Sequence, residues 1–177
     1  MKPTIYIANE LRNPKYGNVF EQLNNSKNIV VNCLKNDSAN VWCRDYMPVK
    51  TGKGNYVQFN YEPSYMDSAA WEKYIPTSSL LHAEIAMIEV LPIKPLGLKL
   101  DGGNVELHNN KAIVTDRFFR DNKANFLSDK KTYAKYLKDA LEVEELIFIP
   151  QYPYDFTGHV DGLVRFINDK TVLINNY

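Results

Sequence analysis

The sequence lacks a long apolar run, an excess of charge of one sign and a cysteine-rich segment. No stretch approaches the roughly 18 uninterrupted apolar residues that cross a bilayer, so we expect no membrane span and no membrane partner. The 21 basic and 21 acidic side chains give a formal net charge of +0, which predicts no nucleic-acid-binding surface. Two cysteines, Cys33 and Cys43, allow at most one bridge and exclude a disulfide framework.

The N-terminal segment MKPTIYIANE also lacks the apolar core of a signal peptide, which favours a cytoplasmic location. Of the 177 residues, 45% are apolar and 24% are charged, the composition of an ordinary soluble protein. This length is sufficient for one hydrophobic core, so the sequence predicts a single domain over residues 1–177. The charge balance favours a small-molecule or peptide partner.

One local pattern occurs three times, with a period of about sixty residues. Each copy has an acidic residue followed by two β-favouring runs around a turn. After Asp45 comes MPVKTGKGNYVQF, after Asp101 comes NVELHNNKAIVTD, and after Asp161 comes LVRFINDKTVLIN. Each copy therefore predicts a β-hairpin that begins at a carboxylate.

A strand candidate precedes each acidic motif, and a helix candidate precedes each strand. The strands are IVVNCL, IEVLPI and LIFIP, the last expected to be buried, and the helices are NVFEQLNN, AAWEKYIPTSSLLHAEIAM and SDKKTYAKYLKDALEVEE. The third helix is expected to have Ser128 as its N-cap. Its apolar face follows helical spacing and comprises Tyr133, Leu137, Ala140 and Leu141.

These units predict an α/β fold. A helix, strand and hairpin cannot bury both faces of a small sheet alone, so the units should pack around a common axis as propeller blades do. The result would be a partial pseudo-symmetric α/β propeller of about three repeat units, with Asp45, Asp101 and Asp161 at one end of the axis. The alternative is an ordinary α/β sandwich in which the hairpins recur by coincidence.

The segment around Asp45 is expected at a strand end, where side chains alternate in direction. Trp42 and Arg44 would then share one face and Asp45 would take the other. An aromatic, a cation and a carboxylate can form part of a binding site. A core tryptophan beside a surface Arg–Asp pair is the alternative interpretation.

The segment Asp101–Asn104 reads as a turn whose two glycines permit positive φ or close approach of another backbone. Beyond it, Glu106 and His108 alternate onto one strand face with Asn104, and we expect that face to be a solvated edge. A simple turn that enters a strand explains this segment equally well.

His159 and Asp161 stand two residues apart in a segment expected to be extended, so their side chains should point the same way. Histidine moves protons near neutral pH, and a carboxylate holds a cation. A hydrogen-bonded histidine in a turn is the alternative. If the motifs converge, paired carboxylates and the Trp42 face suit a planar guanidinium.

The segments VWCRDYMPV, LDGGNVEL and TGHVDGLVRF, in this order, resemble three signatures of the agmatine and peptidyl-arginine deiminases of the guanidine-modifying superfamily. The resemblance implies a pentein-like propeller. It also implies that Asp45 and Asp161 hold the guanidinium and that His159 is the general acid and base. Further substrate contacts are expected at Trp42, Arg44, Asp101, Asn104 and Arg165.

The resemblance further implies that a cysteine thiolate attacks agmatine or a peptidyl arginine and that no metal or other cofactor is needed. The family's nucleophile lies in a final motif that residues 1–177 do not contain. Cys33 lies in an apolar run and should be core, and Cys43 matches a variable position. We therefore expect this chain alone to be inactive and to associate with itself or with a C-terminal half.

Two other functions remain open at this point. One is a module that binds guanidinium or arginyl ligands without turnover. The other is a metal-dependent hydrolase that uses His159, Asp161, Asp45 and Asp101 as ligands for zinc or iron. Residues 61–66, YEPSYM, are either part of a pocket rim or a packed tyrosine-rich loop.

Overall fold

The computed structural model describes residues 2–34, 41–67, 93–122 and 129–176. Contacts divide the chain into two compact units, Met1–Cys43 with Asp67–Val90, and Arg44–Met66 with Leu91–Tyr177. The single domain over residues 1–177 stays a prediction. Across the described ranges, no helix is both long enough and apolar enough to cross a membrane.

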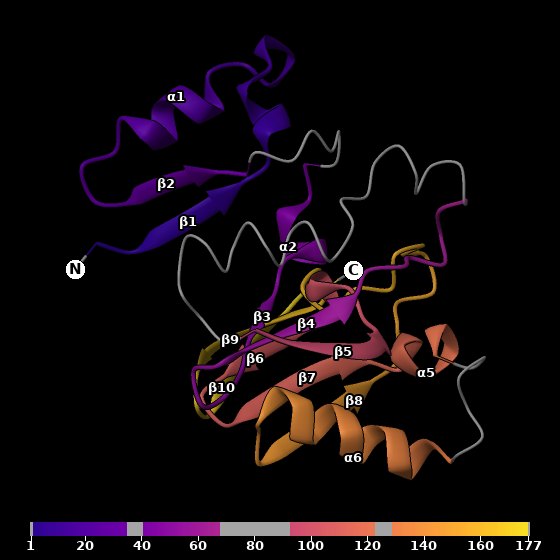
Figure 1. Cartoon of the computed structure of the whole chain (residues 1–177). Coiled ribbons are helices and arrows are strands. Elements are labelled where there is room, and N and C mark those ends of the chain that lie inside the picture. Colours follow the sequence, from indigo (N-terminus) through magenta and orange to yellow (C-terminus); the bar gives the residue numbers. More distant parts are fainter. Residues whose placement is uncertain (1, 35–40, 68–92, 123–128, 177) are drawn as a thin grey trace. The chain divides into compact units, whose positions relative to one another are not determined.

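The first unit contains the helix and strand that the first repeat predicts (Figure 1). Strand β1 (Thr4–Ile7) pairs in parallel with β2 (Val30–Cys33). Two short 3-10 turns, η1 (Asn9–Arg12) and η2 (Pro14–Tyr16), follow β1, and helix α1 (Val19–Asn24) leads toward β2. The predicted helix NVFEQLNN and strand IVVNCL are therefore confirmed.

The described part of the second unit contains three antiparallel hairpins, and all three were expected from the turn signals. They are β3 (Val49–Lys50) with β4 (Tyr56–Asn60), β6 (Glu106–His108) with β7 (Lys111–Thr115), and β9 (Val164–Asn168) with β10 (Thr171–Ile174). The turn between β6 and β7 uses a left-handed residue, Asn109, at φ 51°, which asparagine tolerates better than most residues.

Parallel strands extend two of these hairpins into mixed sheets. β4 pairs in parallel with β5 (Ile93–Lys99), and β7 pairs in parallel with β8 (Glu145–Ile149). The sheet orders are β3-β4-β5 and β6-β7-β8, with β9-β10 as a separate pair. The predicted helix AAWEKYIPTSSLLHAEIAM and nearly all of the strand IEVLPI lie outside the described residues. The α/β class is confirmed, and the propeller arrangement stays a prediction.

Strand β8 corrects one expectation, because it lies at the edge of its sheet and is not buried on both faces. Leu146 and Phe148 pack against the main core, whereas Ile147 remains 37% exposed. A parallel edge strand covered by a helix on one face only explains this alternation.

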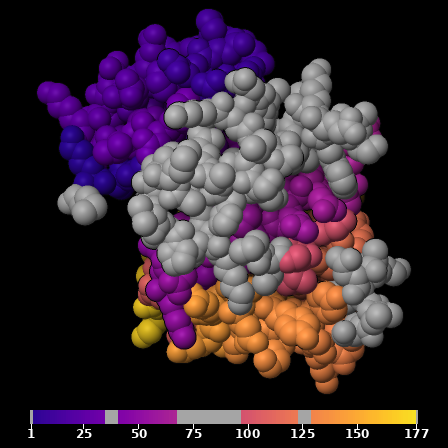
Figure 2. All heavy atoms as spheres, in the orientation of Figure 1, coloured from indigo at the N-terminus to yellow at the C-terminus, as the bar shows by residue number. Residues whose placement is uncertain are grey.

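Helix α6 (Lys130–Leu141) packs its predicted apolar face against the main core. Tyr133, Leu137 and Leu141 are buried, and Ala140 packs beside them. The N-cap is Asp129 and not Ser128, because Asp129 has the extended φ and ψ of a cap and its side chain accepts the Thr132 N–H. Figure 2 shows the outer side chains of this helix, in orange, on the surface of the second unit.

Among the described residues, three short helical segments carry some of the polar side chains of the second unit. They are α2 (Cys43–Tyr46), whose first residue belongs to the other unit, η3 (Gly102–Asn104) and α5 (Arg117–Asp121).

The turns of the three hairpins lie next to one another. A Cβ on Gly52 would come within 2.8 Å of the Asn109 carbonyl oxygen, and the Asn109 amide donates to Asp169 at 2.6 Å. The opposite ends of the hairpins, where the acidic motifs lie, are therefore brought together as well.

Candidate functional site

The peptide of Gly103 joins the three acidic motifs. Its N–H donates to Asp45 Oδ1 at 3.1 Å, and its carbonyl accepts the Asp161 N–H at 3.1 Å. A Cβ here would lie 2.6 Å from Asp45 Oδ1 and 2.4 Å from His159 Nδ1, so only glycine fits. The predicted convergence of the motifs is thus present within the second unit.

His159 lies between two carboxylates and is only 8% exposed. Its Nε2 is 2.9 Å from Asp101 Oδ2, and its Nδ1 is 3.7 Å from Asp45 Oδ1. Burial lowers the pKa of the imidazole, but the hydrogen bond to Asp101 and the surrounding carboxylate charges outweigh burial and raise the pKa above its ordinary value. The arrangement therefore favours an imidazolium that can donate a proton.

The same burial and the neighbouring carboxylates disfavour the charged form of Asp45. Burial raises the pKa of its carboxyl to about 6, and the charges of Asp101 and Asp161 add to this effect. His159 and the Gly103 N–H oppose the increase without cancelling it. A cation placed beside Asp45 would therefore stabilise a carboxylate that is otherwise costly.

Arg44 and Asp45 correct the predicted strand end, because α2 is a helical turn that stops shortly before Pro48. In a helical turn the two side chains need not point to opposite faces. Arg44 Nη2 donates to the Val105 carbonyl at 2.7 Å, and its Nε is 3.2 Å from Asp161 Oδ2. Both side chains thus reach the site, and the Arg44 guanidinium is held by an acceptor set that suits such a group.

Glu106 was expected on a solvated edge, and that expectation is wrong. It is 5% exposed, and its Oε2 lies 3.3 Å from Arg165 Nη1 and 3.5 Å from Arg44 Nη2. The reason is that the outer side of β6 is covered by β9, from which Phe166 N–H also donates to Glu106 at 3.4 Å. His108 is likewise paired, with its Nε2 3.1 Å from Asp169 Oδ1.

The other residues that were predicted to contact the substrate differ in their burial and in their partners. Asn104 is buried, and its side-chain oxygen accepts the Thr115 N–H at 2.9 Å, so its described contact holds the hairpin together. The side chain of Arg165 is 54% exposed beside Glu106. Trp42 belongs to the first unit and is 69% exposed, and its stacking on a substrate stays a prediction.

Two residues near the site, Asp155 and Arg117, were not identified from the sequence, whereas Tyr65 lies in the segment 61–66 that was considered as a pocket rim. Asp155 accepts the His159 N–H at 3.2 Å and the Thr157 N–H at 2.9 Å, which fixes the backbone that leads into His159. Tyr65 donates its hydroxyl to Asp101 Oδ2 at 3.2 Å, and Arg117 is buried behind it. The D-x-T spacing of Asp155 is a recognisable turn signal, whereas Arg117 has none.

The cysteines lie in the first unit, and neither is in a disulfide. Cys33 is half-buried and not core, with its Sγ 3.9 Å from the Ala8 carbonyl oxygen. Among the residues with described positions, no group of three or more His, Cys, Asp or Glu side chains has a geometry that could hold a metal ion. The site as described offers a cation-binding group of carboxylates and a proton carrier.

Comparison with solved structures shows the same fold in guanidine-modifying enzymes. An agmatine deiminase of C. jejuni aligns with a TM-score of 0.64 and 16% identity, over 97% of this chain and 49% of its own. An agmatine deiminase of Enterococcus faecalis aligns with a TM-score of 0.64 and 20% identity, over 96% and 46%. The Pseudomonas aeruginosa dimethylarginine dimethylaminohydrolase, in complex with citrulline, has a TM-score of 0.60 and 8% identity, over 98% and 69%.

The chain thus spans about half the length of the agmatine deiminases that it matches. No curated protein sequence matches it. The family model for the Porphyromonas-type peptidyl-arginine deiminases matches residues 5–177, nearly the whole chain. Together with the convergence of its three motifs, this match shows that the chain belongs to the Porphyromonas-type peptidyl-arginine deiminase family.

Proposed function

We propose that this chain forms the guanidinium-binding and proton-transfer part of a deiminase that converts a guanidine group to a ureido group and ammonia. The observation that supports this proposal best is the convergence of Asp45, Asp161 and His159 on the peptide of Gly103. A buried group with excess negative charge suits a planar cation, and a histidine beside it can protonate a leaving amine.

In the proposed reaction, Asp45 and Asp161 hold the guanidinium and Asp101 holds the imidazole of His159. A cysteine thiolate adds to the guanidinium carbon, and the C–N bond breaks as ammonia leaves with a proton from His159. Water then adds to the covalent thiouronium, with its proton passing to His159, and the C–S bond breaks to give the ureido product. We assign the thiolate to a residue outside 1–177, because the resemblance implies a nucleophile in a final motif that these residues do not contain.

Binding and turnover can be tested separately on the 177-residue chain. Agmatine and an arginyl peptide are titrated by calorimetry, and ammonia release is measured in parallel. We expect saturable binding of at least one ligand, loss of that binding in Asp45→Asn and Asp161→Asn, and unchanged binding in Asp139→Asn, which alters an exposed carboxylate on α6. Equal binding by all three variants would contradict the assigned roles.

The ammonia measurement tests the assignment of the nucleophile. We expect no release from this chain alone. Release that disappears in a Cys33→Ala/Cys43→Ala double variant would show that the nucleophile lies within these residues and that the assignment is wrong. Binding without release by any longer form of the protein would favour the second candidate, a guanidinium-binding module without turnover.

We also propose that the chain associates through the hairpin β9-β10, with a second copy or with a C-terminal half. Ile167, Leu173 and Ile174 are 54%, 59% and 71% exposed on this hairpin, and exposed strands with apolar side chains favour association. Light scattering of the purified chain should show a species larger than the monomer. A Leu173→Lys variant should reduce it, and a monomer in both samples would contradict self-association.

A further inference from the structure

Tyr65 contacts both members of the His159–Asp101 pair. Its hydroxyl donates to Asp101 Oδ2 at 3.2 Å, the same oxygen that lies 2.9 Å from His159 Nε2. Its ring also lies edge-on to the imidazole, with centroids 6.1 Å apart. One carboxylate oxygen is therefore shared between a phenol and an imidazole.

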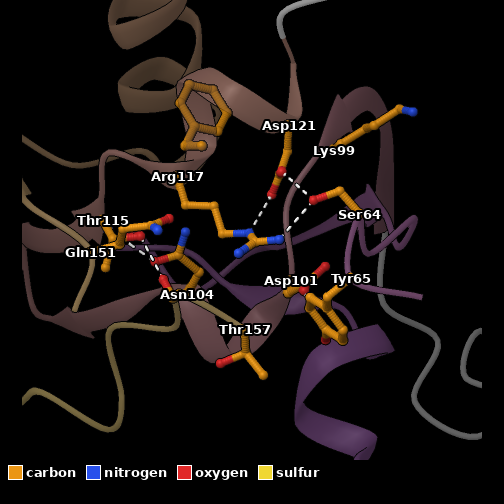
Figure 3. A network of polar contacts seen from close by, with 12 residues as sticks. Ser64, Tyr65, Lys99, Asp101, Asn104, Thr115, Arg117, Asp121, Gln151 and Thr157 are labelled. Atoms are coloured by element: carbon orange, nitrogen blue, oxygen red, sulfur yellow. Dashed lines mark hydrogen bonds and ion pairs between the residues drawn. The ribbon is translucent and has the colours of Figure 1, made fainter. Parts of the chain in front are cut away.

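Arg117 lies beside Tyr65, and its guanidinium points toward Asp121 and Ser64 (Figure 3). Its side chain is 3% exposed and bonds in three directions, to Asp121 Oδ2 at 3.0 Å, Ser64 Oγ at 2.7 Å and the Phe156 carbonyl oxygen at 2.7 Å. Its guanidinium carbon lies 5.4 Å from the centre of the Tyr65 ring, close enough for a cation–π contact. The loop of Ser64 and the loop of Phe156 are thereby joined through one buried cation.

The backbone next to this cation has no room for a side chain. Gly158 has φ +65°, and a Cβ there would lie 2.6 Å from Arg117 Cδ. His159 follows immediately, so a side chain at position 158 would displace either Arg117 or the backbone that leads into His159. Arg117 is therefore a buried structural cation and not a solvated residue on the surface of a helix.

We propose that Tyr65 is a positioning residue for the His159–Asp101 pair, and that Arg117 acts on His159 by fixing Tyr65. The consequence for catalysis rests on the proposed function, whereas the contacts do not. Three carboxylates face His159, those of Asp101, Asp45 and Asp161, and Asp155 lies at its backbone N–H. Two cations lie in these surroundings: Arg44, which is paired with Asp161, and Arg117, which lies against the Tyr65 ring.

Because Tyr65 and His159 share Asp101 Oδ2, the carboxylate of Asp101 raises the pKa of His159 less than it would alone. A hydroxyl that donates to a carboxylate oxygen reduces the attraction of that oxygen for an imidazolium. Burial and the charge of Asp101 raise the pKa of the Tyr65 hydroxyl, so it keeps its proton and remains a donor. Tyr65 therefore keeps the basicity of His159 closer to neutral pH, where an acid and base can work in both directions.

The test is an NMR titration of histidine-labelled 177-residue chain without substrate, in which His159→Gln assigns the His159 signal. Tyr65→Phe removes the hydroxyl and keeps the ring. We expect it to raise the pKa of His159 by about half a unit or more, the effect of losing one hydrogen bond to a charged acceptor. Tyr136→Phe, the same change on the exposed face of α6, should leave the value unchanged.

Arg117→Lys keeps the charge and removes the three-way fork, and we expect it to shift His159 in the same direction as Tyr65→Phe. The pKa of His159 should rise no further in the double variant than in Tyr65→Phe alone, because both changes remove the same contact, the bond from the Tyr65 hydroxyl to Asp101. If Arg117→Lys does not fold, Ser64→Ala, which removes one bond of the fork, replaces it in the same comparison. An unchanged or lowered pKa of His159 in Tyr65→Phe, or additive shifts, would overturn the proposal.

Agmatine binding to the same samples keeps the two proposals apart. A raised pKa of His159 in Tyr65→Phe, without binding of agmatine or of the arginyl peptide by any sample, would confirm the positioning role and contradict the proposed function. Ligand binding with no change in the pKa of His159 in Tyr65→Phe would support the proposed function and contradict the positioning role.

Discussion

Replacement of Asp45 by Asn should stabilise this chain, although it should abolish guanidinium binding. The carboxyl is buried, and its pKa is raised from 3.8 to about 6. A raised carboxyl pKa means that the folded chain holds a proton that the unfolded chain releases, so stability falls as pH rises through the window from about 4 to 6. Asn removes the buried charge and keeps an oxygen that can accept the Gly103 N–H.

The expected magnitude follows from the size of the shift. At about pH 7.5 Asp45 is ionised in both states, and a shift of about two units corresponds to roughly 3 kcal/mol lost from the free energy of unfolding. At about pH 4.5 the folded chain keeps the proton while most unfolded chains have released it, and the loss is only about 1 kcal/mol. The stabilisation by Asp45→Asn should therefore grow with pH by about 2 kcal/mol.

Urea unfolding, followed by circular dichroism at both pH values, measures this difference. Asp139→Asn is the matched control, because Asp139 is exposed and pairs with Lys135 on the same helix. Its effect should stay within about 0.5 kcal/mol at either pH. A destabilised Asp45→Asn chain at neutral pH, or a stabilisation that does not change with pH, would refute the link between burial and the raised pKa.

Three further changes test the core, the helix cap and the site. Leu137→Ala should lower the free energy of unfolding by about 2–5 kcal/mol, because Leu137 is fully buried against the main core, and urea unfolding measures this. Asp129→Ala should cost about 1 kcal/mol through loss of the bond to Thr132 N–H, whereas Asp129→Ser should cost less, and thermal unfolding compares the two. Gly103→Ala should eliminate the proposed guanidinium binding and cost roughly 1–3 kcal/mol, because its Cβ would collide with Asp45 and His159, and unchanged ligand binding in calorimetry would contradict this expectation.

The hairpins and the convergence of the motifs could be predicted because their signals are local. Turn residues such as Asn109, the two glycines after Asp101 and the alternating apolar runs all lie within the segments that they shape. Helix α6 was recognised for the same reason, and only its cap was displaced by one residue to Asp129. Periodic patterns of this length leave little freedom for another interpretation.

The errors occur where a residue's environment comes from distant parts of the chain. Glu106 is buried by Arg165 and Phe166 of another hairpin, and the residues next to Glu106 in the sequence do not predict this burial. The helical turn at Cys43–Tyr46 is too short for any periodicity to reveal. Arg117 depends on contacts from two loops that the sequence separates widely, so its role could be recognised only from the structure.

The contacts between the acidic motifs also bear on the order in which the chain folds. The hairpins β3-β4, β6-β7 and β9-β10 close over short turns and need little loop closure, so they can form early. The bond from Gly103 to Asp45 and the bond from His159 to Asp101 each join residues 58 positions apart, and such contacts form late because long loops must close first. The perturbed acid–base behaviour of this cluster should therefore appear only at the last stage of folding, after most of the secondary structure is already present.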